Sequence, residues 1–73
     1  MQWNLIRIRK EHGETQTDLA SLLNLSVEGY RLKENGVSQF KSDEMFLIAE
    51  HFNLNLDEIF LPTKYTLSKQ SSA

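Results

Sequence analysis

Residues 16–36 read QTDLASLLNLSVEGYRLKENG, and the predicted architecture of the chain rests on them. Apolar residues recur at helical spacing on both sides of Asn24, which predicts two short helices joined by a tight turn. Helices joined in this way lie close together, and Ala20 supplies the small side chain that their contact needs. Asn24 suits the turn because asparagine tolerates a positive φ. Leu25 and Tyr30 are expected to hold the second helix against the rest of the protein.

Capping residues mark the ends of these two helices. Thr15 and Asp18 have the spacing of a capping box at the start of the first helix. Ser26 caps the second helix, which runs to Asn35 and is closed by Gly36. Two helices in this arrangement form a helix-turn-helix, whose second helix can enter the major groove of DNA.

Three further helices are predicted on either side of this pair. One spans residues 3–12 and ends at Gly13. Another begins at its cap Ser42, and a short last helix is framed by Asn55 and Glu58. The sequence therefore predicts an all-α protein, a compact five-helix bundle.

This bundle is expected to form one domain over residues 1–62, because 73 residues allow no second domain. Residues 63–73 form a C-terminal tail, and two interpretations of it remain open. The tail is either flexible or a short strand that pairs at the edge of a dimer.

Composition excludes several classes of protein. The chain has no cysteine, so it has no disulfide, thiolate zinc site or thiol nucleophile. Its longest apolar stretch, residues 45–49, is too short to span a bilayer, and its first residues do not resemble a signal peptide. A cytoplasmic protein without membrane contact is expected.

The formal net charge of −2 argues by itself against nucleic acid as a partner. The charges are unevenly distributed, however. Residues 1–41 carry six basic and five acidic side chains, whereas residues 42–73 carry two basic and five acidic ones. An anionic partner is therefore expected to meet the N-terminal part of the chain.

The chain resembles the helix-turn-helix domain of phage repressors and Cro proteins, the XRE family. The resemblance runs without a gap from residue 5 to residue 60. The residues that carry it are Leu5, Ile8, Arg9, Gly13, Gln16, Leu19, Ala20, Leu23, Leu25, Ser26, Glu34, Gly36, Ile48, Ala49, Phe52 and the run 56–60.

The resemblance implies a set of DNA-contacting residues on the second and third helices and just after them. These are Gln16, Thr17, Ser26, Val27, Glu28, Arg31, Leu32, Asn35 and Lys41. By family position, Val27, Glu28 and Leu32 would read bases, through contacts to thymine methyls or to cytosine N4. Arg31 could reach either a guanine or a phosphate.

Three other members of this set, Gln16, Asn35 and Lys41, are expected to meet the DNA backbone. Gln16 begins the second helix, where the family places a side chain and a backbone N–H against a phosphate. Asn35 and Lys41 are expected to face phosphates after the third helix. The resemblance also pairs Arg9 with Glu34 as a structural ion pair that joins the first and third helices.

Three residues depart from the family pattern. Glu14 stands where an apolar residue is usual, and Asn24 replaces the usual turn glycine. Lys33 occupies a position that normally faces inward, so its ammonium group is expected to extend back to the solvent.

Enzymatic chemistry is not predicted. His12 and His51 lie in different helices, and neither has a partner at metal-ligand spacing, so neither a metal nor a cofactor is expected. Ser26 and Ser42 are interpreted as caps rather than nucleophiles.

Two functions fit this sequence. The first is a sequence-specific DNA-binding transcriptional regulator of the Cro or repressor kind, acting as a homodimer on a double-stranded DNA operator. The second is a protein-binding anti-repressor or modulator that captures a repressor protein through the same helical face. Salt dependence of binding separates the two, because phosphate contacts weaken steeply as salt rises.

Overall fold

The computed structural model describes residues 1–60, which form five helices and no strand. The helices are α1 (Trp3–Glu11), α2 (Gln16–Leu22), α3 (Val27–Glu34), α4 (Ser42–Phe52) and α5 (Leu56–Phe60). The all-α, five-helix prediction is confirmed. The predicted domain boundary at residue 62 and the tail 63–73 lie outside the described residues.

Hydrogen bonds at the helix ends confirm most of the predicted caps. Thr15 Oγ1 accepts from the backbone N–H of Asp18 at 3.1 Å, and Asp18 Oδ2 accepts from the N–H of Thr15 at 2.9 Å. Ser26 Oγ accepts from the N–H of Gly29 at 3.0 Å. Asn24 turns the chain between α2 and α3 with φ 58°.

The predicted cap of α4 is wrong by one residue. Ser42 is the first helical residue, and the extended Lys41 precedes the helix as its N-cap. Glu44, at the third helical position, accepts from the backbone N–H of Lys41 at 2.9 Å. This carboxylate accepts from the N-cap backbone, whereas the Ser42 hydroxyl was expected to accept from a backbone N–H of the first turn.

Each helix places one large apolar side chain in the centre of the core, less than 2% exposed. These side chains are Leu5, Leu19, Tyr30, Ile48 and Ile59. Burial of this kind contributes about 1.5–3 kcal/mol per side chain before entropy is counted. The core therefore ties all five short helices together.

The loop between α3 and α4 also contributes to the core. Phe40 is buried, with its ring centroid 6.0 Å from that of Tyr30 and 5.4 Å from that of Phe60. Both pairs meet edge to face, which is a favourable aromatic geometry. The aromatic contacts join α3, the loop and α5.

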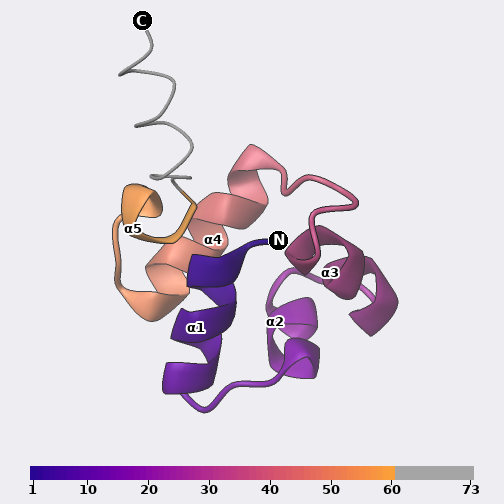
Figure 1. The fold of residues 1–73 in the computed structure, drawn as a ribbon, viewed down its shortest axis with the longest axis horizontal. Helices are drawn as coiled ribbons and strands as arrows, with labels where there is room; N and C mark the ends of the chain where they lie inside the picture. The colour runs from indigo at the N-terminus through magenta and orange to yellow at the C-terminus, as the bar shows by residue number, and fades with distance from the viewer. Residues whose placement is uncertain (61–73) are drawn as a thin grey trace, which may run out of the picture.

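Helix α3 lies at the edge of the molecule, beside α2 and away from α5 (Figure 1). Its outer side faces the solvent. Along residues 1–60, none of the helices has both the length and the apolar character needed to cross a membrane.

Candidate functional site

A buried carboxylate fixes α3 to the two helices that precede it. Glu34 is 2% exposed, and Arg9 donates to it from Nε at 2.8 Å and from Nη2 at 3.3 Å. Tyr30 Oη and Gln16 Nε2 donate to the same carboxylate, each at 2.8 Å. The structure thus brings together Arg9 and Glu34, and it adds one residue from α2 and one from α3.

The hydrogen bonds decide the ionisation of this group. Burial raises the pKa of Glu34, but the bonds from Arg9, Gln16 and Tyr30 outweigh it, and the net pKa is lowered. The pKa of the Tyr30 hydroxyl shifts in the opposite direction, because burial and the hydrogen bond to Glu34 raise it. Glu34 therefore stays ionised and Tyr30 stays neutral near pH 7.

A second buried ion pair joins α3 to α4. Lys33 Nζ lies 2.6 Å from Glu44 Oε1, and the two side chains are 13% and 9% exposed. The expectation that the Lys33 ammonium group extends to the solvent is therefore wrong, since the inward-facing stem meets a carboxylate. Burial raises the pKa of Glu44, but the hydrogen bonds from Lys33 and from the Lys41 backbone outweigh this effect, and the net pKa is lowered.

Acid should destabilise the fold through these two glutamates. Their folded pKa values lie below the value of about 4.3 expected in the unfolded chain. Their contribution to stability is therefore complete above pH 4.3 or so, and it is lost as the pH falls through the lower folded pKa values.

Urea unfolding followed by circular dichroism over a pH series should show this loss. We expect Glu44→Gln to flatten the acid limb of the curve relative to wild type. A free energy of unfolding that stays constant as the pH falls well below 4 would contradict the account.

The outer side of α3 carries four of the nine side chains that were predicted to contact DNA. Glu28, Arg31, Leu32 and Asn35 are exposed on it. Val27 was expected on this exposed face as well, but it is half-buried and packs against the core. It lies in the first turn of α3, close to where α3 meets α2, so only part of its side chain faces outward.

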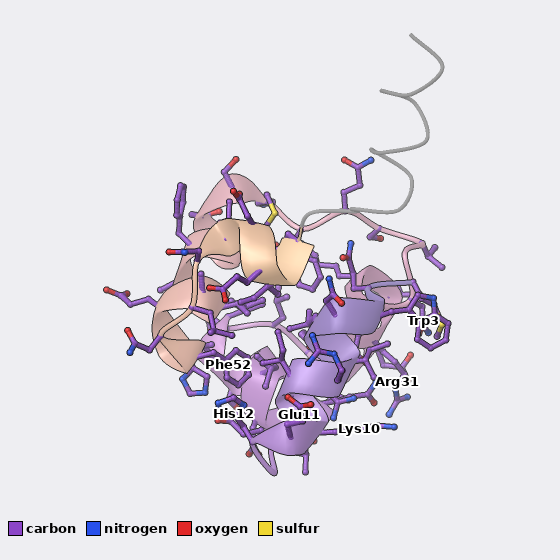
Figure 2. All side chains as sticks on the ribbon, turned by 60° about the vertical axis from the view of Figure 1, so that its left-hand side comes forward. Trp3, Lys10, Glu11, His12, Arg31 and Phe52 are labelled. Atoms are coloured by element: carbon purple, nitrogen blue, oxygen red, sulfur yellow. The ribbon has the colours of Figure 1, made fainter. Side chains whose placement is uncertain are left out.

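Arg31 is held by α2 rather than projecting freely. Its Nε donates to Gln16 Oε1 at 3.1 Å, and its Nη1 lies 3.9 Å from Glu28 Oε2. Figure 2 shows Arg31 on the same side of the view as Lys10, with His12 and Phe52 toward the other side. The amide of Gln16, expected to face a phosphate, is thus engaged by Glu34 on one atom and by Arg31 on the other.

The remaining predicted residues are exposed at the beginnings of α2, α3 and α4. Thr17 is exposed in the first turn of α2, and Ser26 is exposed where α3 begins. Lys41 is exposed just before α4.

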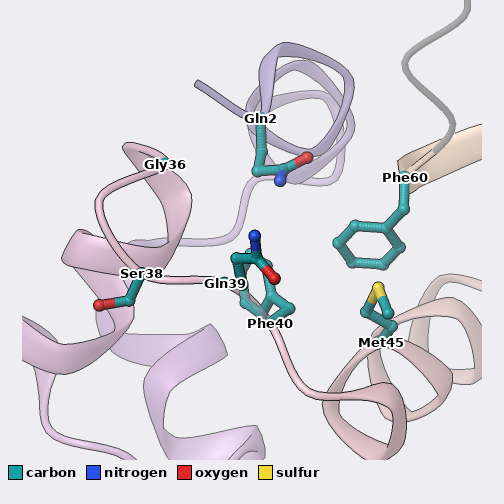
Figure 3. Close-up of a pocket in the computed structure, with 7 residues that line it drawn as sticks. All are labelled: Gln2, Gly36, Ser38, Gln39, Phe40, Met45 and Phe60. Atoms are coloured by element: carbon teal, nitrogen blue, oxygen red, sulfur yellow. The ribbon is translucent and has the colours of Figure 1, made fainter. Parts of the chain in front are cut away.

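In the described part of the chain, a hollow lies between the start of α1, the α3–α4 loop and the facing sides of α4 and α5 (Figure 3). Phe40, Met45 and Phe60 give it apolar walls, and Gln2 and Gln39 lie at its polar side. Among residues 1–60, its lining consists of uncharged side chains and Gly36.

The two histidines take part in local contacts. His51 Nε2 lies 2.7 Å from Glu14 Oε2, which gives the unusual Glu14 a partner on α4. His12 Nδ1 lies 2.9 Å from the Ile8 carbonyl oxygen, and its ring packs against Phe52. Within residues 1–60, no three metal-ligating side chains cluster.

Comparison with known proteins shows a family match. The family it identifies is described as "Helix-turn-helix", and the match covers residues 5–59 of the chain. No curated protein and no solved structure shows significant similarity to the chain.

Proposed function

The chain belongs to the XRE-type helix-turn-helix family of DNA-binding regulators, and we propose that it is a sequence-specific transcriptional regulator of the Cro or repressor kind. In this proposal α3 lies in the major groove of a double-stranded operator. The observation that carries it is the fixed placement of α3. Glu34, near the end of that helix, receives bonds from α1, α2 and α3, while the outer side of α3 remains accessible.

The proposed contacts divide into base readers and backbone contacts. Glu28 and Leu32 would meet base edges, with Val27 contributing only the exposed part of its side chain. Backbone contacts would come from the backbone N–H of Gln16 and from the side chains of Thr17, Ser26, Asn35 and Lys41.

The acidic net charge is compatible with this proposal because its excess lies in residues 42–73, which carry two basic and five acidic side chains, whereas residues 1–41 carry six basic and five acidic ones. The buried Glu34 and Glu44 leave this balance unchanged, because each is paired with a cation inside the fold. Exposed Arg31 and Lys41 supply positive charge at the proposed contact face.

A single module of this size reads only a short half-site. We therefore infer a homodimer on a two-fold operator, with half-sites about 34–36 Å apart. Such a complex would regulate by occluding the polymerase in the cytoplasm.

The decisive experiment is selection of duplexes from a random library, followed by titration at two salt concentrations. We expect a recovered sequence with two-fold symmetry and an affinity that falls steeply as salt rises. Failure to bind any duplex at low salt would overturn the proposal.

Lys41→Ala should weaken binding by a similar factor on every duplex, because a phosphate contact carries no sequence information. The slope of log affinity against log salt should fall by about one unit. Arg7→Ala is the matched control, because it also removes one positive charge but lies elsewhere on the molecule. Arg7 lines a separate hollow together with Leu54 and Glu58. A changed sequence preference in Lys41→Ala would contradict the assignment.

An anti-repressor that binds a repressor protein is the second candidate. The observation in its favour is the exposure of Trp3 and Val37, at 68% and 74%, near the exposed Leu32. The backbone N–H of Gln2 bonds to the Glu34 carbonyl oxygen at 2.9 Å, so the start of α1 lies at the end of α3. A complex with a repressor whose affinity changes little with salt would favour this candidate.

A further inference from the structure

The hydrogen bonds around Glu34 continue outward to the proposed DNA-contacting surface. Gln16 Nε2 donates to the buried Glu34 carboxylate at 2.8 Å, and Gln16 Oε1 accepts from Arg31 Nε at 3.1 Å. The glutamine therefore links a side chain that is 2% exposed to one that is half exposed. The order of the chain of bonds is Arg9, Glu34, Gln16, Arg31.

Both ends of the Gln16 amide are used in this chain. An amide offers an acceptor oxygen and a donor nitrogen that point in different directions. The ionised Glu34 requires a donor, and this fixes the amide nitrogen toward the interior. The oxygen is then directed at α3, where the Arg31 Nε–H meets it. A carboxylate at position 16 would repel Glu34, and an apolar side chain would bond to neither partner.

The bond to Gln16 uses only one of the five N–H donors of Arg31. The terminal Nη groups make no bond to the glutamine, and the distance from Nη1 to Glu28 is 3.9 Å in an exposed pair. A guanidinium group binds a guanine edge or a phosphate through two donors in a fixed fork. The hydrogen bond from Nε to Gln16 therefore orients this fork before DNA binds.

We propose that Gln16 is a positioning residue that holds the Arg31 guanidinium group in place for DNA. Buried Glu34 fixes Gln16, and Gln16 fixes Arg31. The inference rests on the proposed function, because the orientation of Arg31 matters only if α3 meets DNA. It assigns to Gln16 a role that acts through Arg31, in place of a direct side-chain contact to phosphate.

The first test concerns the free protein and needs no DNA. The heteronuclear NOE of each arginine Nε–H reports its order on the picosecond to nanosecond timescale. In the wild type, we expect high values for Arg9 and Arg31 and a low value for Arg7, whose bonds to Glu11 come from Nη1.

In Gln16→Met, the heteronuclear NOE of Arg31 Nε–H should fall to that of Arg7. The NOE of Arg9 Nε–H should stay high, which shows that the fold is intact. An Arg31 value that equals that of Arg7 in the wild type would overturn the proposal, as would one that the substitution leaves unchanged.

The second test is a double-mutant cycle on the duplex that the wild-type protein selects from a random library. Arg31→Met should weaken binding about tenfold, and Gln16→Met by a similar or somewhat smaller factor. The double variant should bind no more than about twofold worse than Arg31→Met alone, because Gln16 acts through Arg31. Arg7→Met is the matched control for loss of one arginine.

Losses that multiply in the double variant would overturn the positioning role, because Gln16 would then contact DNA independently. If the wild type selects no duplex, the proposed function fails, and with it the role of this pair in DNA recognition. The NOE measurement would still show whether Gln16 orders Arg31. The two failures are therefore distinguishable.

Discussion

Glu34→Ala should lower the free energy of unfolding by about 3–5 kcal/mol, because it leaves the Arg9 guanidinium group buried without its carboxylate partner. Gln16 and Tyr30 lose their acceptor in the same substitution. For a domain of this size, each 1 kcal/mol shifts the melting temperature by roughly 4–8 °C. A fall of about 12 °C or more is expected in thermal unfolding followed by circular dichroism.

Glu11→Ala is the control for this substitution. It removes an exposed partner of Arg7, at 3.3 Å on the surface of α1, and exposed pairs contribute less than about 1 kcal/mol. Glu34→Gln keeps an acceptor for Arg9 and should fall between the alanine variant and the wild type. A melting temperature of Glu34→Ala within a few degrees of wild type would show that the buried pair contributes little to the stability of the fold.

Lys33→Met should have the second-largest effect, a loss of about 2–4 kcal/mol, because the Glu44 carboxylate would stay buried without its ammonium partner. Glu44 retains the bond from the Lys41 backbone N–H, so the loss should be smaller than for Glu34→Ala. Chemical unfolding in urea at pH 7 measures it.

A second substitution distinguishes the cost of burying an unpaired charge from the cost of lost packing. In Lys33→Met with Glu44→Gln, no charge is buried at this position, and the amide oxygen can still accept from Lys41. Most of the lost stability should return. Lys10→Met, at an exposed position on α1, controls for the loss of one surface charge. A double variant as unstable as Lys33→Met would show that packing, and not the unpaired carboxylate, is responsible.

Local patterns in the sequence predicted the helices because their causes are local. Thr15 and Asp18 lie three residues apart and bond to each other across one helical turn. Asn24 adopts the positive φ that the α2–α3 turn needs. The pairing of Arg9 with Glu34 was implied by the family resemblance, and the structure brings the two side chains together.

Features that depend on distant elements could not be predicted in this way. Phe40 lies in a loop without periodicity, yet it is buried against Tyr30 and Phe60. The Lys33 ammonium group was expected to reach the solvent, because nothing near Lys33 in the sequence indicates that the Glu44 carboxylate of α4 lies beside it.

Two details of the candidate site were missed for the same reason. The half-burial of Val27 depends on how α3 packs against the core. The engagement of the Gln16 amide depends on Glu34 and Arg31, which lie 18 and 15 residues further along the chain.

The anchoring of α3 through one side of the helix has an evolutionary consequence. Tyr30, Lys33 and Glu34 attach the helix to the core, whereas Glu28 and Leu32 face outward. Under the proposed function, stability and target choice would be encoded by different residues of the same eight-residue helix. Outward-facing positions can diversify without endangering the fold, so a lineage of such chains can acquire new binding sites while the same core persists.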